Sequence, residues 1–183
     1  PFVVAMIGFF GVAEALVQLE HLDMPRIKQK VSRVVPSWSD IRRYFRLMLK
    51  SSGIGTVIGA LPGTGGDIAA LLAYDQAKRT TKAPEVPFGE GAKEGLVAPE
   101  AANNAAIGGA FVPMLTLGIP GDAVTAIIIG ALYIHGLRPG PLLLSESPHL
   151  FWFMVGNLTL ANLFLLVFGL SGIRFFAKVV ECP

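Results

Sequence analysis

Two short proline–glycine motifs interrupt apolar stretches of this chain and constrain its fold more than any other feature. They run from Leu61 to Asp67 (LPGTGGD) and from Leu117 to Asp122 (LGIPGD). Each lies in an apolar run long enough to cross a bilayer, where a stable transmembrane helix has no need of Pro-Gly at its centre. A break at membrane depth leaves backbone N–H and C=O groups that are costly unless something binds them. The motifs therefore predict binding sites of the kind that membrane transporters build from broken helices.

The composition is typical of a membrane protein. Hydrophobic residues make up 52% of the chain, the mean hydropathy is +0.59, and charged residues make up 15%, against about a quarter in an average soluble domain. The 21 residues from Leu150 to Leu170 carry no charge, which is enough to span about 30 Å of hydrocarbon. We expect an ordinary membrane helix there, and a soluble protein with an unusually apolar core is the alternative.

The charges and the cysteine count argue against several other classes of protein. The net charge is only +2, and eight of the fifteen basic residues lie between Arg26 and Lys50, beside apolar segments. They are typical of topology and lipid-headgroup residues rather than of a nucleic-acid surface. Cys182 is the single cysteine, and His21, His135 and His149 are scattered. We therefore expect no disulfide framework and no metal site built from cysteine or histidine. We expect no cofactor apart from a coupling cation, sodium or proton.

The chain is predicted to be one partial transmembrane domain over residues 1–183. Its segments are the end of a membrane helix at 1–19, a basic loop and interfacial helix at 20–50, a broken helix or hairpin at 51–78, a broken helix at 95–135 and a membrane helix at 150–170. Ser39 is a plausible N-cap for the basic helix, whose alternative is a cytosolic helix packed on protein. Because the chain opens inside an apolar run without a methionine, we expect a piece of a larger membrane protein.

The segment at 51–78 has two possible topologies. Its two arms of about eleven residues are each too short to cross a bilayer alone. Lys50 precedes the segment, and Lys78, Arg79 and Lys82 follow it. Positive charge at both ends favours a re-entrant hairpin with both feet on one side over a single broken span.

The first motif combines conformational freedom with a helix start. Glycines after Pro62 can adopt conformations closed to other residues, and the helical arm begins directly after them, where free N–H groups and the positive dipole end favour an anion. A carboxylate substrate would suit this site. The candidate substrate-binding residues are Pro62, Gly63, Thr64, Gly65, Gly66 and Asp67. The alternative is a tight turn in which Asp67 caps the helix.

The second motif repeats this logic. The carbonyl groups freed before the break can coordinate a cation, and the next helix start faces an anion. Thr116 and Asp122 add side-chain oxygens that a hard cation such as sodium would accept. The candidate substrate-binding residues are Gly118, Pro120, Gly121 and Asp122. The alternative is a proline kink that binds no ligand.

A third candidate site lies on the helix before the second break. Asn103 and Asn104 follow Glu100 by three and four residues, so the three share one helical face. A carboxylate within the membrane is a candidate functional residue. We expect Asn103 and Asn104 to bind substrate, and Asn104, Thr116 and Gly118 to bind a coupling cation. Helix–helix contacts through the Asn residues, or a Glu100 near the water interface, are the alternatives.

Several ordered motifs resemble one known family. The runs GALPGTGGDIAA from Gly59, APEAANNAA from Ala98 and LTLGIPG from Leu115 are similar to the large membrane subunit of the tripartite tricarboxylate transporters, the TctA family. The match is dense over 50–145 and looser outside it. The resemblance implies an all-α secondary transporter with broken helices or re-entrant hairpins, built as two inverted halves, of which this chain would be part of the second.

The resemblance also implies partners and a function. The family works with a small membrane subunit and a periplasmic solute-binding protein that delivers citrate or related carboxylates. Import would be coupled to a cation, sodium or proton, across the bacterial inner membrane by a multi-pass protein. Two other classes stay open: a membrane scaffold or assembly subunit whose breaks only shape packing, and a membrane-embedded enzyme using Glu100 or Asp67. No nucleophile–base pair supports the enzyme.

Overall fold

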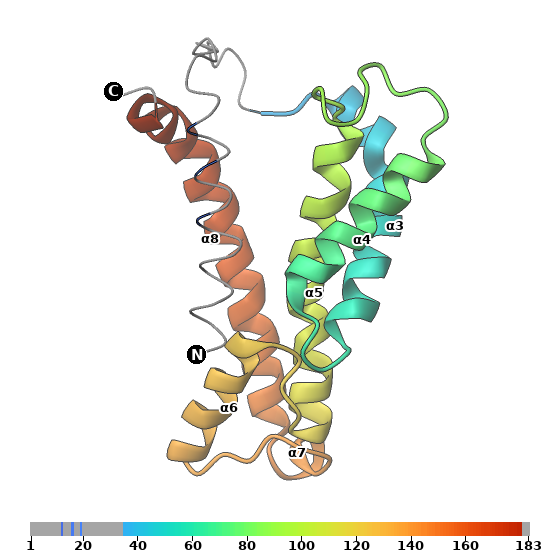
Figure 1. Ribbon diagram of the computed structural model, residues 1–183. Coiled ribbons are helices and arrows are strands. Elements are labelled where there is room, and N and C mark those ends of the chain that lie inside the picture. Colours follow the sequence, from blue (N-terminus) through green and yellow to red (C-terminus); the bar gives the residue numbers. More distant parts are fainter. Residues whose placement is uncertain (1–11, 13–15, 17–18, 20–34, 181–183) are drawn as a thin grey trace. The chain divides into compact units, whose positions relative to one another are not determined.

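The computed structural model describes residues 35–180 and the isolated positions 12, 16 and 19, with backbone alone for residues 144 and 174–180. Apart from the three isolated positions, the predicted helix end at 1–19 lies outside the described residues, as do most of the basic loop and Cys182. The described part contains helices and no strand, which confirms the all-α prediction for it. Its helices are α3 (Trp38–Gly59), α4 (Gly65–Thr80), α5 (Glu94–Leu117), α6 (Ala123–Ile134), α7 (Leu143–Glu146) and α8 (Pro148–Val180) (Figure 1). Val35–Leu170 form one compact unit, which holds every contact described below.

α3 is one continuous helix of 22 residues. Its N-cap is Ser37 rather than the expected Ser39, and the Ser37 hydroxyl accepts a hydrogen bond from the Asp40 N–H at 3.1 Å. The helix contains both the basic segment and the first apolar arm, so the boundary that we expected at residue 50 is not a helix end. The helix continues there because its second half packs closely on α5. It ends at Gly59 and α4 begins at Gly65, which places the break where the first motif lies.

Small residues at every fourth position join α3, α4 and α5, which lie side by side in Figure 1. The buried members are Ser51, Gly55 and Gly59 on α3, Ala69, Ala73 and Ala77 on α4, and Ala98, Ala102, Ala106 and Ala110 on α5. A Cβ added to Gly55 would lie 2.1 Å from the Ala102 carbonyl oxygen, and one added to Gly59 would lie 2.2 Å from that of Ala106. α3 and α5 therefore run in the same direction with their backbones in contact, as small-residue interfaces between membrane helices allow.

A pair of glycines on α3 tests this packing. We expect Gly55→Ala to destabilise the full-length protein by about 1–3 kcal/mol, because its methyl group would meet the α5 backbone. Gly53→Ala is the matched control, since a Cβ at Gly53 has nothing within 4 Å and alanine favours the helix. The measurement is the midpoint of thermal unfolding in detergent. Equal midpoints for the two variants would contradict the close α3–α5 contact.

Ion pairs fasten the connection between α4 and α5 to the start of α3. Lys93 Nζ lies 3.3 Å from Asp40 Oδ1, and Arg43 pairs with Glu85. Hydrogen bonds from the Ser37 hydroxyl and then from Lys93 lower the pKa of the Asp40 carboxyl. All four paired side chains are substantially exposed, so the pairs contribute little to stability. These pairs mark one end of the group of helices α3, α4 and α5, which we call the charged end. The breaks lie away from this end.

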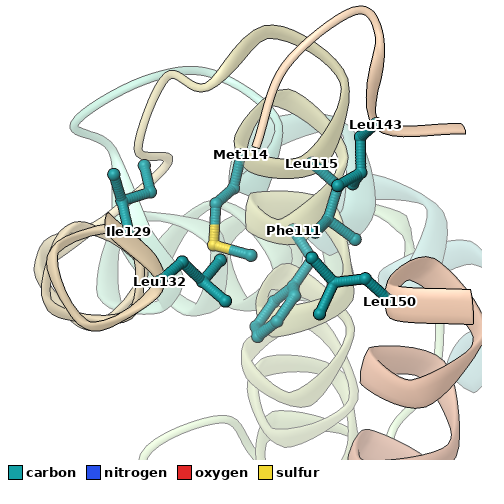
Figure 2. Packing of buried hydrophobic residues seen from close by; sticks show 7 residues of the cluster. All are labelled: Phe111, Met114, Leu115, Ile129, Leu132, Leu143 and Leu150. Carbon is teal, nitrogen blue, oxygen red and sulfur yellow. The ribbon is translucent and has the colours of Figure 1, made fainter. Parts of the chain in front are cut away.

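A second core forms around the C-terminal end of α5 (Figure 2). It consists of Phe111, Met114 and Leu115 from α5, Ile129 and Leu132 from α6, Leu143 from α7 and Leu150 from α8. α5 continues through Pro113 to Leu117, so this proline does not end the helix early. The core fixes α6 against the last turns of α5, and so fixes the start of α6 near the second break.

α8 contains the segment predicted to cross a membrane. Pro148–Ile173 is the one helical segment among the described residues that is long and apolar enough to span a bilayer. Leu150 is buried, but every residue from 159 to 170 is exposed. An apolar surface of this extent needs a membrane or further protein to cover it.

Candidate functional site

The two proline–glycine motifs meet in the structure. The Gly63 N–H donates to the Gly121 carbonyl oxygen at 2.8 Å. Gly121 is buried, and a Cβ added to it would lie 2.7 Å from Ala110 Cα and 2.9 Å from the Gly59 carbonyl oxygen. The two loops are therefore in direct contact, and Gly121 is a packing position between α3 and α5.

The first loop depends on glycine conformations. Gly63 and Gly65 have φ angles of 81° and 69°, in the left-handed region that side chains disfavour. The Thr64 hydroxyl donates to the Leu61 carbonyl oxygen at 2.8 Å and also reaches that of Ile58. Thr64 thus holds the turn onto the end of α3. No side chain caps α4, so Asp67 lies in its first turn without the capping role that we considered for it.

The second loop ends in a capped helix. The Asp122 carboxylate accepts a hydrogen bond from the Thr125 N–H at 2.7 Å, and the Thr125 hydroxyl accepts one from the Asp122 N–H at 2.9 Å. This is a capping box, which satisfies two of the free N–H groups of a helix start. We expected the start of α6 to face an anion, but the Asp122 carboxylate already occupies that end.

α4 and α6 start at the meeting point of the loops and leave it in opposite directions along α5. The Tyr74 ring, towards the end of α4, lies 5.6 Å from the Phe88 ring, which lies beside Gly95 at the start of α5. The loop after α6 reaches the other end of α5, where the Gly140 N–H donates to the Leu115 carbonyl oxygen at 3.2 Å. The N-termini of α4 and α6, which are the positive ends of the two helix dipoles, therefore flank the point where the two loops meet.

A cavity of about 520 Å³ lies at this place, within the usual size range of ligand sites. It is lined by Gly63, Thr64, Gly65, Gly66, Asp67, Asn103, Ile107, Pro120, Asp122, Ala123 and Val124. Eight of these eleven are residues that the sequence singled out. The Asn103 carboxamide lies over the first turn of α4, with its Oδ1 atom 2.3 Å from the position of a Cβ on Gly66.

Three of the predicted residues in the two loops, Pro62, Gly118 and Gly121, do not line this cavity because they belong to turns or to packing. Pro62 and Gly121 are outside the lining. Gly118 ends α5 with a φ of 70°, and its N–H donates to the Met114 carbonyl oxygen at 3.1 Å. A Cβ on Gly118 would lie 2.8 Å from the Pro139 carbonyl oxygen, so this glycine permits a close approach of two loops.

The residues expected to bind a cation are not brought together. The Asn104 side chain donates to the Glu100 carbonyl oxygen at 2.9 Å, and the Thr116 hydroxyl donates to that of Val112 at 2.7 Å. Asn104 and Thr116 are twelve positions apart, which corresponds to about 18 Å along α5. Thr116 lines a separate, largely apolar cavity of about 550 Å³ between α5 and α8. The predicted face of Glu100, Asn103 and Asn104 thus contributes only Asn103 to the candidate site.

The charge of the cavity is unusual for an anion site. Its lining contains two carboxylates, Asp67 and Asp122, and no Lys, Arg or His. Among the described residues, no group of three or more His, Cys, Asp or Glu side chains could hold a metal ion. Recognition of an anion there would depend on backbone N–H groups, the α4 dipole and the Asn103 amide.

Three lining residues were not predicted: Ile107, Ala123 and Val124. Ile107 follows Asn103 by one helical turn, so the spacing could have placed it on the same face. Ala123 and Val124 form the first turn of α6, and their position could have been inferred only from the meeting of the two loops.

Comparison with known proteins assigns the family. The chain belongs to the tripartite tricarboxylate transporter TctA family, whose model matches residues 1–183. It is 38% identical over its whole length to an uncharacterized 52.8 kDa protein in the TAR-I ttuC' 3' region of Agrobacterium vitis, of which it covers 36%. It is 40% identical, over 70% of its length, to an uncharacterized protein in the TAR-II ttuC' 3' region of the same organism, of which the match covers 53%. The chain therefore spans about a third to a half of these relatives. No solved structure matches it.

Proposed function

We propose that this chain is part of the membrane subunit of a secondary transporter that imports tricarboxylates or related carboxylates across the bacterial inner membrane. A periplasmic binding protein delivers the substrate, a small membrane subunit completes the complex, and a sodium or proton gradient drives uptake. The family membership supports the class of protein. The coupling, the direction and the partners are parts of the proposal.

One observation carries the proposed site: the two broken helices form a single cavity, flanked by the N-termini of α4 and α6. The N-terminus of α4 has no side-chain cap, so the N–H groups of its first turn remain for a ligand. An anion at such a helix end is favoured by both hydrogen bonds and the dipole. A carboxylate group fits this end of the cavity. The cation site is left without assigned residues.

The lengths of the arms support a place for the cavity near the middle of the bilayer. From Ser51 to Gly59, α3 rises about 14 Å, and from Gly65 to Tyr74, α4 rises about 15 Å. Both lengths are about half of the hydrocarbon thickness of about 30 Å. The arms end in the charged residues Lys50 and Asp75. We infer a re-entrant hairpin whose tip carries the first motif, in one half of an inverted-repeat transporter.

The hairpin makes a topological prediction. Single cysteines at positions 50 and 80, in a background without other cysteines, are expected to react with a membrane-impermeant reagent from the same side of the membrane. The reason is that α3 begins at the charged end of these helices and α4 returns towards it. Reaction from opposite sides would replace the hairpin with a continuous broken span.

Transport is distinguished from the alternative functions by uptake. Cells that lack the full-length protein, but keep its partner subunits, are expected to lose uptake of labelled citrate, and the cloned protein is expected to restore it. Residual uptake at the normal rate would favour a scaffold. Conversion of citrate to another compound by the purified protein would favour an enzyme.

A further inference from the structure

Asn103 and Gly66 form a contact that the proposed function does not by itself explain. The Asn103 Oδ1 atom occupies the space of a Gly66 side chain, at 2.3 Å from the Cβ position, and Cγ lies at 3.3 Å. Gly66 lies in the first turn of α4, within the helix, where alanine would be the more stable residue. Because position 66 has no side chain, the Asn103 carboxamide can lie against the first turn of α4, beside the cavity.

The contact also orients the carboxamide. Because Oδ1 is the side-chain atom nearest to the Gly66 Cβ position, the Nδ2 group lies on the side of the carboxamide away from Gly66. Asn103 is an exposed residue that lines the cavity, and among the described residues its side chain has no hydrogen-bond partner. An amide nitrogen carries two donors, and the lining offers no Lys, Arg or His that could serve instead.

We propose that Asn103 is the side chain that determines the specificity of this cavity for a carboxylate. This inference rests on the proposed function. Nδ2 donates to one carboxylate oxygen while the N–H groups at the start of α4 bind another part of the same anion. Gly66 is required as glycine because it leaves room for the carboxamide. A donor at this position offsets the repulsion from Asp67 and Asp122, which share the cavity.

The substitution Asn103→Asp tests this directly, because it keeps the size and shape of the side chain but replaces the donor with an acceptor. The full-length protein is expressed with its partner subunits, and uptake of labelled citrate is measured against concentration, per protein in the membrane. We expect the KM to rise about tenfold or more, the effect of losing a hydrogen bond to a charged group, with a smaller change in the maximal rate. Because the new carboxylate also repels the substrate, a residue that only packs against Gly66 is distinguished by the uncharged double variant described next, in which its KM would stay normal.

A double substitution separates binding from folding. Gly66→Ala alone is expected to displace the carboxamide and to weaken uptake. In Gly66→Ala/Asn103→Ala the methyl group has room, so the protein should reach the membrane in normal amounts and still show the raised KM. Normal uptake by the double variant, or a normal KM in Asn103→Asp, would overturn the inference. If Gly65→Val nevertheless abolishes uptake, the proposed site at the first loop stands without Asn103; if Gly65→Val also transports normally, the proposed site fails as well, while transport itself is tested by uptake in cells that lack the protein.

Discussion

Gly65→Val is expected to reduce carboxylate uptake below about a tenth of the normal rate while the protein remains in the membrane. Gly65 has a φ of 69° and lines the cavity, and nothing lies within 4 Å of its Cβ position. A β-branched side chain resists this conformation by about 1–2 kcal/mol, and it would project where the ligand approaches the α4 backbone. The loss therefore arises from the site and not from a clash with the protein.

The measurement for Gly65→Val is uptake of labelled citrate by the full-length transporter, normalised to protein in the membrane. Leu165→Val serves as the control, because it exchanges one exposed aliphatic side chain on α8 for another. Normal uptake in Gly65→Val would show that the first loop is a turn and not a binding site.

Gly121→Val is expected to have an equally large effect for a different reason. Its side chain would meet Ala110 Cα and the Gly59 carbonyl oxygen, which are backbone atoms that cannot move aside. Overpacking of this kind costs about 1–3 kcal/mol, and sometimes more, and it would separate the two loops that the Gly63–Gly121 hydrogen bond joins. We expect a lower midpoint of thermal unfolding and less protein in the membrane.

The matched control for Gly121→Val is Gly130→Val on α6, where a Cβ meets nothing within 4 Å. Thermal unfolding in detergent and the amount in the membrane are measured for both. A normal midpoint in Gly121→Val with loss of uptake alone would mean that Gly121 contacts the substrate, contrary to its buried position.

Much of the helical order could be predicted from the sequence, because proline and glycine end helices by local backbone physics. The break before Gly65 and the one after Leu117 fall within the two motifs for that reason. The continuity of α3 through residue 50 could not be predicted, because it depends on Gly55 and Gly59 meeting α5. The period of small residues every four positions is visible in the sequence, and it could have indicated this interface.

The candidate site was predicted in part for a similar reason. The residues from Gly63 to Asp67 lie in the cavity because they form the loop and the first turn of α4, where the motif itself ends one helix and begins the next. Asn103 and Asn104 are adjacent in sequence, yet only Asn103 faces the cavity, and that choice depends on how α5 is rotated against α4. Asp is a common N-cap residue, and Thr125, which completes the capping box with Asp122, follows it by three residues. The sequence could therefore have indicated this capping box.

The most direct test of the carboxylate site is protection of the cavity by its ligand. Val124→Cys places a thiol in the lining at the start of α6, and Glu90→Cys places one in the exposed connection before α5. In the full-length transporter without other cysteines, citrate is expected to slow modification of the thiol at position 124 by a small charged thiol reagent and to leave the thiol at position 90 unaffected. Equal rates at position 124 with and without citrate, in a protein that still takes up citrate, would contradict a carboxylate site between the two broken helices.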